Sequence, residues 1–363
     1  MFEMIFLAAA GIYFLLSVVF FSGAGKRFKK YHRDNLPAVS LIVCARNEEE
    51  NILACLNSLD SLSYPIDKLE IIIADDNSTD STGKIADDFI SGKGKFKKII
   101  VDDSELKLKG KTRALSQAIK ISSGEIIITT DADCVVPLNW VEAIVSYYSE
   151  DVAAVCGFTY QPVKNWFSGM QSIDLIYLLT IAAGAVNISK PVSCIGNNMS
   201  YRKNVYVETG GYEKLPFSVT EDFLLLKAIN NLKKYKILFP LDPDILVETS
   251  PCKNLKEVYH QKKRWAVGGL NASAWGGFVM FTALLANYCL ILTPLFFSRV
   301  CLYLAVLKLA SDFFLLYPVH KQLGKSKNLK YFIHFQIYYI VYVITIPWLL
   351  LFNRRVKWKG REY

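Results

Sequence analysis

The segment from Ile126 to Cys134, with the sequence IIITTDADC, limits the possible folds more than any other part of the chain. Its uncharged run, rich in β-branched residues, is typical of a strand that is buried on both faces of a sheet. The run ends at Asp131 and Asp133, and open α/β sheets bind their ligands at the carboxyl ends of their strands. We therefore expect both carboxylates to line a ligand site. Taken alone, the three residues DAD at 131–133 would also be explained by a plain acidic turn.

Asp131 and Asp133 are also the candidate ligands of a metal ion. Two carboxylates this close together repel each other unless a cation joins them. A hard divalent ion such as Mg²⁺ or Mn²⁺ prefers oxygen ligands of this kind, and a diphosphate on the open side of the ion would complete its coordination.

Strands and helices alternate between residues 36 and 272. Short apolar runs predict strands at 39–45, 69–76, 97–103 and 126–134. Helical apolar spacing predicts helices at 47–59, 81–89 and 111–122, the first of them with acidic residues in its first turn. This alternation indicates an α/β domain with a mostly parallel, doubly wound sheet.

Polar clusters follow three of the predicted strands. They are Arg46-Asn47-Glu48, the run DDNSTD that starts at Asp75, and the pair Asp131 and Asp133. Because the carboxyl ends of parallel strands meet at one edge of a sheet, we expect these clusters to lie close together.

The first 24 residues predict a membrane anchor. Hydrophobic residues make up 52% of the chain, which is too many for an ordinary soluble enzyme. The stretch 2–21 has Glu3 as its single charge and is long enough for a bilayer core of about 30 Å. Cations follow the apolar run instead of preceding it, which favours an uncleaved anchor with its amino terminus outside and residue 25 onward in the cytoplasm. These cations are Lys26, Arg27, Lys29, Lys30 and Arg33.

The region 275–352 predicts two to three further membrane segments, with apolar stretches at 276–297, 300–319 and 332–352. Lys308 and Asp312 interrupt the second stretch four residues apart, and we expect this pair to face protein instead of lipid. Three crossings here would put the basic tail 353–363 outside, against the positive-inside rule. We therefore expect one stretch to be re-entrant or interfacial and the tail to be cytoplasmic.

The apolar segment 166–187 lies within the α/β region and carries one charge in its middle, Asp174. A spanning helix here would separate residues 131–133 from the acidic residues near 221. We expect instead an interfacial helix against the membrane, with a plain buried core helix as the alternative.

The net charge of +9 comes from 42 Lys and Arg against 33 Asp and Glu, and the excess lies beside apolar segments. This placement favours anionic lipid headgroups as partners and argues against nucleic acid, since no stripe of interleaved basic and aromatic residues is present. The eight cysteines show no metal-ligand spacing, which is typical of reduced residues in a cytosolic body.

Five motifs occur in an order that resembles a known family. They are DDNSTDST at 75–82, DAD at 131–133, GNNMSYRK at 196–203, TED at 220–222 and QKKRW at 261–265. The chain from Val39 to Trp265 thus resembles membrane-bound family 2 glycosyltransferases, among them cellulose, chitin and hyaluronan synthases and ceramide glucosyltransferases. The resemblance implies a GT-A fold and transfer of a sugar from a nucleotide diphosphate sugar with inversion at the anomeric carbon.

The residues expected to bind the nucleotide sugar are Arg46, Glu48, Asp75, Asp76, Lys111, Asp131 and Arg264. A carboxylate at a strand end can accept a hydrogen bond from the imide N–H of uracil, and the resemblance gives this role to Asp75 or Asp76. Capping of the next helix is the alternative for this pair. Lys111 and Arg113 would neutralise the diphosphate or, alternatively, be solvated charges at the start of a helix.

Transfer to a hydroxyl requires a base, and the resemblance assigns this role to Asp222, with Glu221 orienting it or accepting from a neighbour. An acidic helix start is the alternative for both residues. Arg264 would stabilise the leaving diphosphate, and Trp265 would offer a flat surface to a sugar. The residues expected near the acceptor are Gly196, Asn197, Asn198, Gln261 and Trp265. Without the family, QKKRW predicts a basic helix face on lipid headgroups, a contact also expected of Lys262 and Lys263.

The final residues, WKGREY, resemble the close of non-processive lipid glycosyltransferases, although a generic basic tail would look similar. A processive synthase needs a channel for its polymer, and the few membrane segments here leave little material for one, which favours single transfer. The complete QKKRW motif favours the opposite, because this motif is strongest in processive enzymes. The prediction is an integral membrane enzyme that moves a sugar from a UDP-sugar to a lipid hydroxyl at the cytoplasmic face. The alternatives are a processive polysaccharide synthase and, more remotely, a non-catalytic nucleotide-binding membrane protein.

Overall fold

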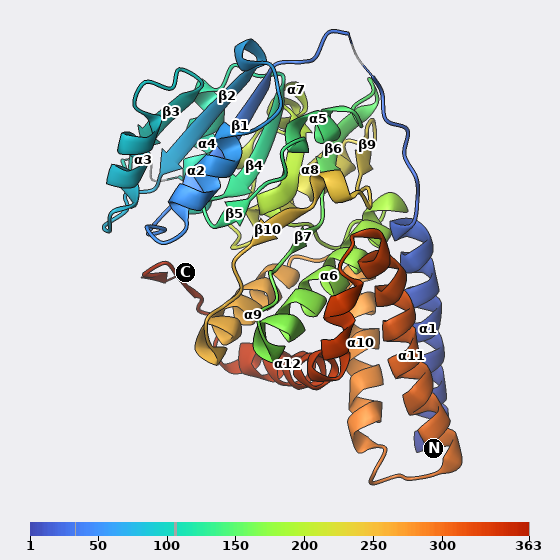
Figure 1. The fold of residues 1–363 in the computed structure, drawn as a ribbon. Helices are drawn as coiled ribbons and strands as arrows, with labels where there is room; N and C mark the ends of the chain where they lie inside the picture. The colour runs from blue at the N-terminus through green and yellow to red at the C-terminus, as the bar shows by residue number, and fades with distance from the viewer. Residues whose placement is uncertain (33, 105–106, 363) are drawn as a thin grey trace. The chain divides into compact units, whose positions relative to one another are not determined.

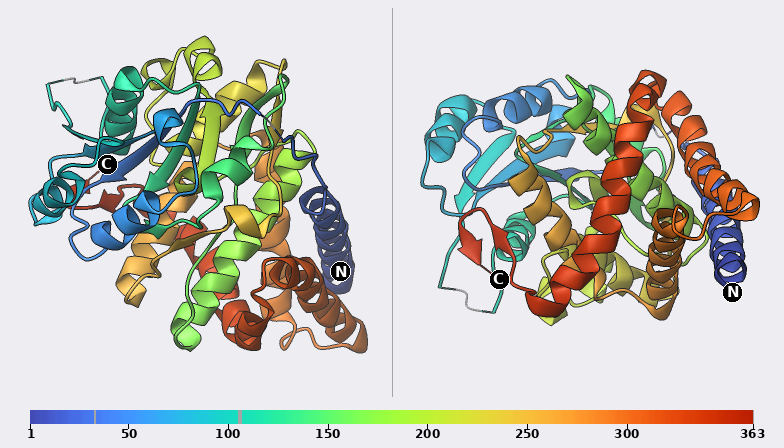
Figure 2. Two further views of the ribbon diagram at one scale, coloured as in Figure 1. Left: turned by 45° about the horizontal axis from the view of Figure 1, so that its top comes forward. Right: turned by 90° about the horizontal axis from the view of Figure 1, so that it is seen from below.

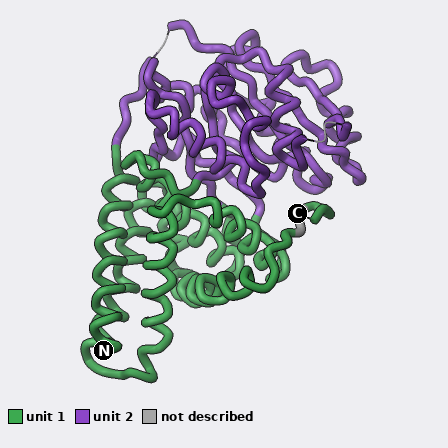
Figure 3. The backbone as a smooth tube through the Cα atoms, turned by 180° about the vertical axis from the view of Figure 1, so that it is seen from behind, with its two compact units in different colours: residues 1–26, 161–193, 251–363 green, residues 27–160, 194–250 purple. Residues whose placement is uncertain are grey.

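The computed structural model describes residues 1–32, 34–104 and 107–362. Arg33 of the basic cluster and Tyr363 of the WKGREY tail lie outside the described residues. The chain forms two compact units, shown in green and purple in Figure 3. The helical unit comprises residues 1–26, 161–193 and 251–363, and the sheet unit comprises residues 27–160 and 194–250. The predicted α/β domain therefore contributes 161–193 and the residues after 250 to the helical unit.

A seven-stranded sheet organises the sheet unit, with the strand order β3-β2-β1-β4-β8-β6-β9. Strands β1 to β4 are mutually parallel, and β8 runs antiparallel to both of its neighbours, so the predicted mostly parallel sheet is confirmed. The strands are β1 Val39–Ala45, β2 Leu69–Asp75, β3 Phe96–Ile100, β4 Ile126–Asp131, β6 Val152–Cys156, β8 Met199–Arg202 and β9 Lys236–Leu238.

The α-helices of this unit lie along the sheet (Figure 1). They are α2 Ile52–Asp60, α3 Thr82–Ile90, α4 Lys111–Ile121, α5 Trp140–Val145, α7 Lys203–Glu208 and α8 Glu221–Asn231. Short 3₁₀ helices occur at Ile66–Lys68, Gly196–Asn198, Tyr212–Lys214 and Pro243–Ile245. Helix α2 starts later than predicted, so the acidic residues 48–50 precede it and do not form its first turn.

The apolar runs of β1, β2 and β4 are buried on both faces, as their lack of alternation predicts. A second, three-stranded sheet has the order β5-β10-β7. Its strands are β5 Cys134–Val135, β10 Val247–Thr249 and β7 Thr159–Tyr160. The predicted strand 126–134 is therefore two strands, because the chain turns at the two carboxylates and joins the smaller sheet.

Six α-helices make up most of the helical unit (Figures 1 and 2). They are α1 Phe2–Ala24, α6 Trp166–Asn187, α9 Leu255–Gly269, α10 Ala274–Leu292, α11 Arg299–Gln322 and α12 Phe332–Phe352, with a 3₁₀ helix at Ser326–Tyr331. Helix α1 packs against α6, α10 and α11. The backbones of α1 and α6 touch at Gly23 and Gly184, where a Cβ on either glycine would collide with the opposite helix.

Within the described part of the chain, five helices are long and apolar enough to cross a membrane, namely α1, α6, α10, α11 and the segment Ser326–Phe352. Helix α6 is enclosed by protein, since 89% of its most apolar stretch is buried, and this burial matches the alternative of a core helix. Lys308 and Asp312 are fully buried and paired at 2.8 Å, so the expectation that they face protein is confirmed.

The end of the chain is a hairpin of β11 Lys357–Trp358 and β12 Arg361–Glu362. Its turn residues Lys359 and Gly360 have φ values of 46° and 78°. Two consecutive positive φ values are typical of a type I′ hairpin turn, and Gly is the residue that adopts them most easily. Strand β11 contacts α9.

Candidate active site

The first two polar clusters meet at one edge of the sheet unit, as predicted. Asn47 and Asn77 follow β1 and β2 with φ values of 52° and 55°, a conformation that Asn tolerates better than most residues. Asn47 Oδ1 accepts from the backbone N of Thr79 at 2.8 Å, and Thr82 Oγ1 accepts from the backbone N of Glu48 at 2.7 Å. The two loops therefore hold each other in place.

Arg46 and Glu48 serve this loop framework. The Arg46 guanidinium donates to the backbone oxygens of Asp76 and of Asn77, the latter at 3.2 Å. Glu48 Oε2 accepts from Asn51 Nδ2 at 2.8 Å. Contact of either side chain with a nucleotide sugar stays a prediction.

Asp75 and Asp76 have different surroundings. Asp75 Oδ1 accepts from the backbone N of Ser78 at 2.9 Å and so holds the turn after β2. This bond does not cap the next helix, because α3 has Ser81 as its N-cap and no side-chain cap bond there. Asp76 is 2% exposed, and its Oδ1 lies 3.8 Å from Nη2 of Arg113, which also pairs with Asp103. Asp75 is thus committed to the turn, and Asp76 is the better candidate for contact with a base.

Lys111 joins two carboxylates of the site. Its Nζ lies 2.5 Å from Asp131 Oδ1 and 3.5 Å from Glu221 Oε1. Burial opposes the charge of the ammonium, but these two carboxylates outweigh burial and hold the pKa of Lys111 well above its ordinary value. The alternative of a solvated helix-start charge is wrong, because the side chain is 16% exposed and paired.

Cys44 lies on β1 opposite Asp131 of β4. Burial raises the pKa of its thiol, opposed by Lys111 and reinforced by Asp131, Glu221 and Asp76. The thiol is therefore protonated at neutral pH and is a poor nucleophile. Charges of Asp76, Asp131, Glu221 and Lys111 thus all act on the carboxyl end of β1.

Asp133 follows β4 and is held by β10. Its Oδ2 accepts from Thr249 Oγ1 at 3.3 Å, and its Oδ1 lies 3.5 Å from Cys134 Sγ. Among the described residues, no group of three or more His, Cys, Asp or Glu side chains could hold a metal ion. Two carboxylates still fit Mg²⁺ or Mn²⁺, because such ions commonly take one or two carboxylates and complete their shell with substrate phosphates and water.

Asp222 and Glu221 begin α8, and Asp222 faces the loop at Gly196. A Cβ on Gly196 would lie 3.2 Å from Asp222 Oδ2, so the backbone of this loop approaches the carboxylate closely. Asp222 Oδ1 accepts from the backbone N of Phe223 at 2.8 Å. Asp222 is thus oriented by its own helix start, and a side chain at position 196 would crowd its carboxylate.

Asn197 and Asn198 are framework residues in this structure. Asn198 is 1% exposed, and its Nδ2 donates to the backbone oxygens of Phe158 and Ile245 at 2.7 and 2.8 Å. Asn197 Oδ1 accepts from Thr159 Oγ1 at 2.9 Å. Their contact with an acceptor stays a prediction.

The QKKRW motif lies on α9 in the helical unit. Lys262 is buried and pairs with Asp174 of α6, while Tyr342 of α12 donates to the other oxygen of Asp174 at 2.7 Å. Lys263 is 6% exposed. The expected contact of Lys262 and Lys263 with lipid headgroups is therefore wrong, because both side chains are buried.

Gln261, Arg264 and Trp265 lie on the same helix, with Arg264 and Trp265 partly exposed. Lys262 Nζ lies 4.2 Å from the centroid of the Trp265 ring, so the buried cation supports one face of this indole. The expected roles of the three residues at the diphosphate and the acceptor stay predictions.

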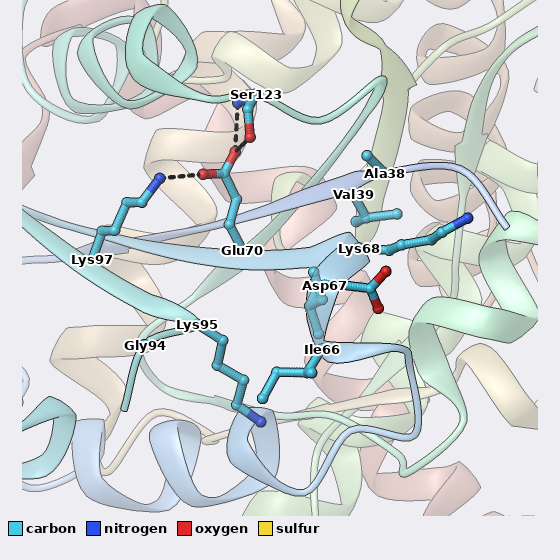
Figure 4. A pocket seen from close by; sticks show the side chains of 11 residues that line it. Ala38, Val39, Ile66, Asp67, Lys68, Glu70, Gly94, Lys95, Lys97 and Ser123 are labelled. Atoms are coloured by element: carbon cyan, nitrogen blue, oxygen red, sulfur yellow. Dashed lines mark hydrogen bonds and ion pairs between the residues drawn. The ribbon is translucent and has the colours of Figure 1, made fainter. Parts of the chain in front are cut away.

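A pocket of about 350 Å³ lies at the opposite, amino-terminal edge of β1 and β2 (Figure 4). Its wall includes Glu70, which accepts from Ser40 Oγ and the Ser123 backbone N at 2.5 Å, and from Lys97 Nζ at 2.8 Å. Burial disfavours the charge of Glu70, but these donors outweigh it and lower the pKa to about 2. Glu70 on β2 thus connects β1 and β3 to the residues that follow α4.

Sequence reasoning missed Thr249 and Cys55. Cys55 of α2 lies with its Sγ 3.6 Å from the backbone oxygen of Asp131, and Thr249 contacts Asp133 across 116 residues of sequence. Neither residue belongs to a motif. A polar residue that ends a short apolar run, as Thr249 ends LVET, is too common to mark a site.

Residues 126–352 match the family described as glycosyl transferase family group 2, and residues 40–210 match glycosyl transferase family 2. The chain belongs to glycosyl transferase family group 2. The family predicted from the motifs is therefore confirmed, and with it the classification of the chain as a glycosyltransferase.

Two curated relatives of this family 2 chain illustrate its range. It is 29% identical over 264 residues to beta-monoglucosyldiacylglycerol synthase of Nostoc sp., covering 70% of this chain and 53% of the relative. It is 28% identical over 245 residues to poly-beta-1,6-N-acetyl-D-glucosamine synthase of Staphylococcus aureus, covering 65% and 55%. The chain spans about half the length of the curated relatives it matches.

The solved mannosyltransferase PcManGT of Pyrobaculum calidifontis, in complex with GDP-Man and Mn²⁺, has a similar fold. The TM-score is 0.61 at 18% identity, and the likeness covers 93% of this chain and 99% of the other. The GT-A fold implied by the motifs is thereby confirmed.

Proposed function

We propose that this family 2 glycosyltransferase is an integral membrane enzyme that moves one sugar from a UDP-sugar to a lipid hydroxyl at the cytoplasmic face, with inversion. The observation that carries the proposal is the position of Lys111 between Asp131 at the end of β4 and Glu221 beside Asp222. This lysine links the carboxylates expected at the donor to the start of the helix that holds the expected base.

Asp76, Lys111 and Asp222 each have one role in the proposed reaction. Asp76 accepts from the imide N–H of the base, and the Lys111 ammonium balances negative charge at the leaving diphosphate. Asp222 takes the proton of the acceptor hydroxyl as the oxygen bonds to the anomeric carbon, and the nucleoside diphosphate leaves from the opposite face. This single displacement is what inverts the configuration.

Asp133 and Asp131 would hold Mg²⁺ or Mn²⁺, which supplies positive charge to the departing diphosphate when bound. Asp133 keeps neutral donors on both oxygens, and Asp131 carries the lysine. The Mn²⁺ in the solved mannosyltransferase is in line with this proposal. That mannosyltransferase holds GDP-Man, and guanine, like uracil, offers N–H donors that a carboxylate can accept. GDP-mannose is therefore the donor to compare with UDP-sugars.

The helical unit supports a place in the membrane with three spans, α1, α10 and α11. Phe20 contacts Trp275 at the start of α10, Phe21 contacts Phe314 of α11, and α1 packs along both helices. Helix α12 lies across them (Figures 1 and 2). Three crossings from an outside amino terminus would put the tail 353–363 in the cytoplasm, in agreement with its basic charge.

An apolar side of α12 is exposed, and cations flank the helix. Its exposed residues follow helical spacing at Ile333, Ile337, Val341, Trp348 and Phe352. Such a helix is suited to the membrane interface, where an acceptor lipid would approach. The diacylglycerol in the name of the Nostoc relative supports a lipid acceptor.

A processive polysaccharide synthase is the second candidate, favoured by the intact QKKRW and by the poly-N-acetylglucosamine relative. Product analysis separates the two. Purified protein in detergent is incubated with radiolabelled UDP-sugars, with GDP-mannose as comparison, a total lipid extract and Mn²⁺. Label in a small organic-soluble glycolipid supports single transfer, whereas label in a long water-soluble chain would replace our proposal with the processive one.

A further inference from the structure

The hydroxyl of Thr249 occupies a position that the proposed reaction does not yet use. Thr249 Oγ1 donates to Asp133 Oδ2 at 3.3 Å, and the residue is 7% exposed. Cys134 Sγ lies 3.5 Å from the other carboxylate oxygen, Asp133 Oδ1. Two neutral donors therefore hold the two oxygens of the carboxylate that we assign to the metal ion.

The small sheet fixes where this hydroxyl lies. Thr249 of β10 pairs antiparallel with Cys134 of β5, directly beside Asp133. Val247, two residues earlier on the same face of the strand, is fully buried in the core, and Glu248 on the other face accepts from Tyr160. Because a β-branched side chain is also stiff at χ1, the Thr249 hydroxyl has little freedom to turn away.

A neutral donor and a charged donor do different things to a carboxylate. Asp131 receives the Lys111 ammonium at 2.5 Å, and this ion pair offsets part of its negative charge. A hydroxyl, in contrast, fixes the orientation of Asp133 without itself neutralising the carboxylate. Cys55 holds the backbone of the same turn, with Sγ 3.6 Å from the Asp131 oxygen.

We propose that Thr249 is a positioning residue for the divalent cation, holding Asp133 in the orientation in which it ligates Mg²⁺ or Mn²⁺. The inference rests on the proposed function for the assignment of Asp133 to the ion. According to this inference, β10, which is far from Asp133 in the sequence, contributes a side chain that supports the metal site.

The test measures metal binding and not turnover. Mn²⁺ is titrated into the purified full-length protein in detergent with saturating UDP, and free and bound Mn²⁺ are followed by electron paramagnetic resonance. A titration without protein corrects for Mn²⁺ bound to UDP alone. The variants are Thr249→Val and Thr249→Ala, which lose the hydroxyl, and Thr249→Ser, which keeps it.

Two further variants act as controls. Thr180→Val removes a buried hydroxyl that bonds within α6, to the Ile176 oxygen at 2.7 Å, and should bind Mn²⁺ like the wild type. Asp133→Asn tests the metal site itself and should lose the bound signal. Thermal unfolding of every variant shows which of them are folded, and either hydroxyl-free variant suffices if the other does not fold.

We expect Thr249→Val and Thr249→Ala to weaken Mn²⁺ binding about tenfold, and Thr249→Ser to restore it. Wild-type affinity in the hydroxyl-free variants, with binding lost in Asp133→Asn, would overturn the role of Thr249 and leave the proposed function standing. Unchanged binding in Asp133→Asn would overturn the assignment of the metal site, and the role of Thr249 with it.

Discussion

Lys111 Nζ lies 2.5 Å from Asp131 Oδ1, so a protein cation already sits beside one of the two carboxylates at the end of β4. The same ammonium is 3.5 Å from Glu221. Removing the lysine would leave the two carboxylates facing each other without a counter-charge.

The variant Lys111→Met should therefore lower kcat/KM for the nucleotide sugar about 100-fold, because a preorganised cation at the diphosphate is lost. Steady-state kinetics on the most active donor measure this effect. The matched control is Lys120→Met on the same helix, where the side chain is half exposed and pairs with Glu213. Equal rates for the two variants would contradict a role of Lys111 at the donor.

Asp222→Asn should reduce kcat by about 10²- to 10⁴-fold while UDP binding persists, since the amide cannot accept the hydroxyl proton. Kinetics and calorimetric titration with UDP report the two quantities separately. Asp87→Asn, at a surface carboxylate paired with Lys98, serves as control. A normal turnover rate in Asp222→Asn would remove this residue from the role of base.

Removal of divalent ions with EDTA should lower the rate at least about 100-fold, because a metal ion contributes several kcal/mol at a leaving diphosphate. Addition of Mg²⁺ or Mn²⁺ in excess over the chelator should restore it. Full activity in excess EDTA would show that Lys111 and the other cations suffice without a metal.

The lowered pKa of Glu70 should make the free energy of unfolding depend on pH in the acid range. Its pKa falls from the ordinary value of 4.5 to about 2 in the folded protein, so its contribution is fully present above pH 4.5. As the pH falls through 4.5 toward 2, the unfolded state takes up the proton first, and about 3 kcal/mol of stability is lost. Unfolding temperatures of the wild type and Glu70→Gln should differ at pH 6 and converge near pH 2. A constant difference across this range would contradict the shift.

If α1, α10 and α11 are the three spans, as we propose, a reporter fused after the last residue should be cytoplasmic, in agreement with the basic tail. Protease and membrane-impermeant labelling of intact cells and of inverted vesicles locate it. A second fusion within residues 293–298, between α10 and α11, should report the outside. Labelling of the tail from outside would mean that α12 also crosses the membrane.

The strands that carry the site could be predicted from the sequence because they are buried on both faces. Runs such as 39–45 and 126–131 have no competing pattern, and their polar ends mark the sheet edge. The order of the motifs along the chain then indicated that Asp131 and Glu221 belong to one site. Lys111, outside these motifs and expected at the diphosphate, pairs with both carboxylates in the sheet unit.

Contacts between segments that are far apart in the chain could not be predicted from the sequence. Thr249 reaches Asp133 only because β10 pairs with β5, a two-residue strand with no periodic signal. Lys262 resembles a surface charge until its partner Asp174 is seen on α6. The burial of α6 likewise depends on helices that precede and follow it by many residues, so its composition alone left two interpretations open.

The contact between Gly23 and Gly184 gives helix α1 a packing role in addition to its proposed role as a membrane anchor. Helix α1 is so close to α6 that neither position accepts a side chain, and Lys26 then donates to the backbone oxygen of Asn187 at 2.5 Å. A shortened chain that starts near residue 36 would strip α6 of one of its covering helices and expose apolar surface. Attempts to obtain a soluble enzyme by trimming the amino terminus should therefore yield aggregates, and purification in detergent should begin from the full chain.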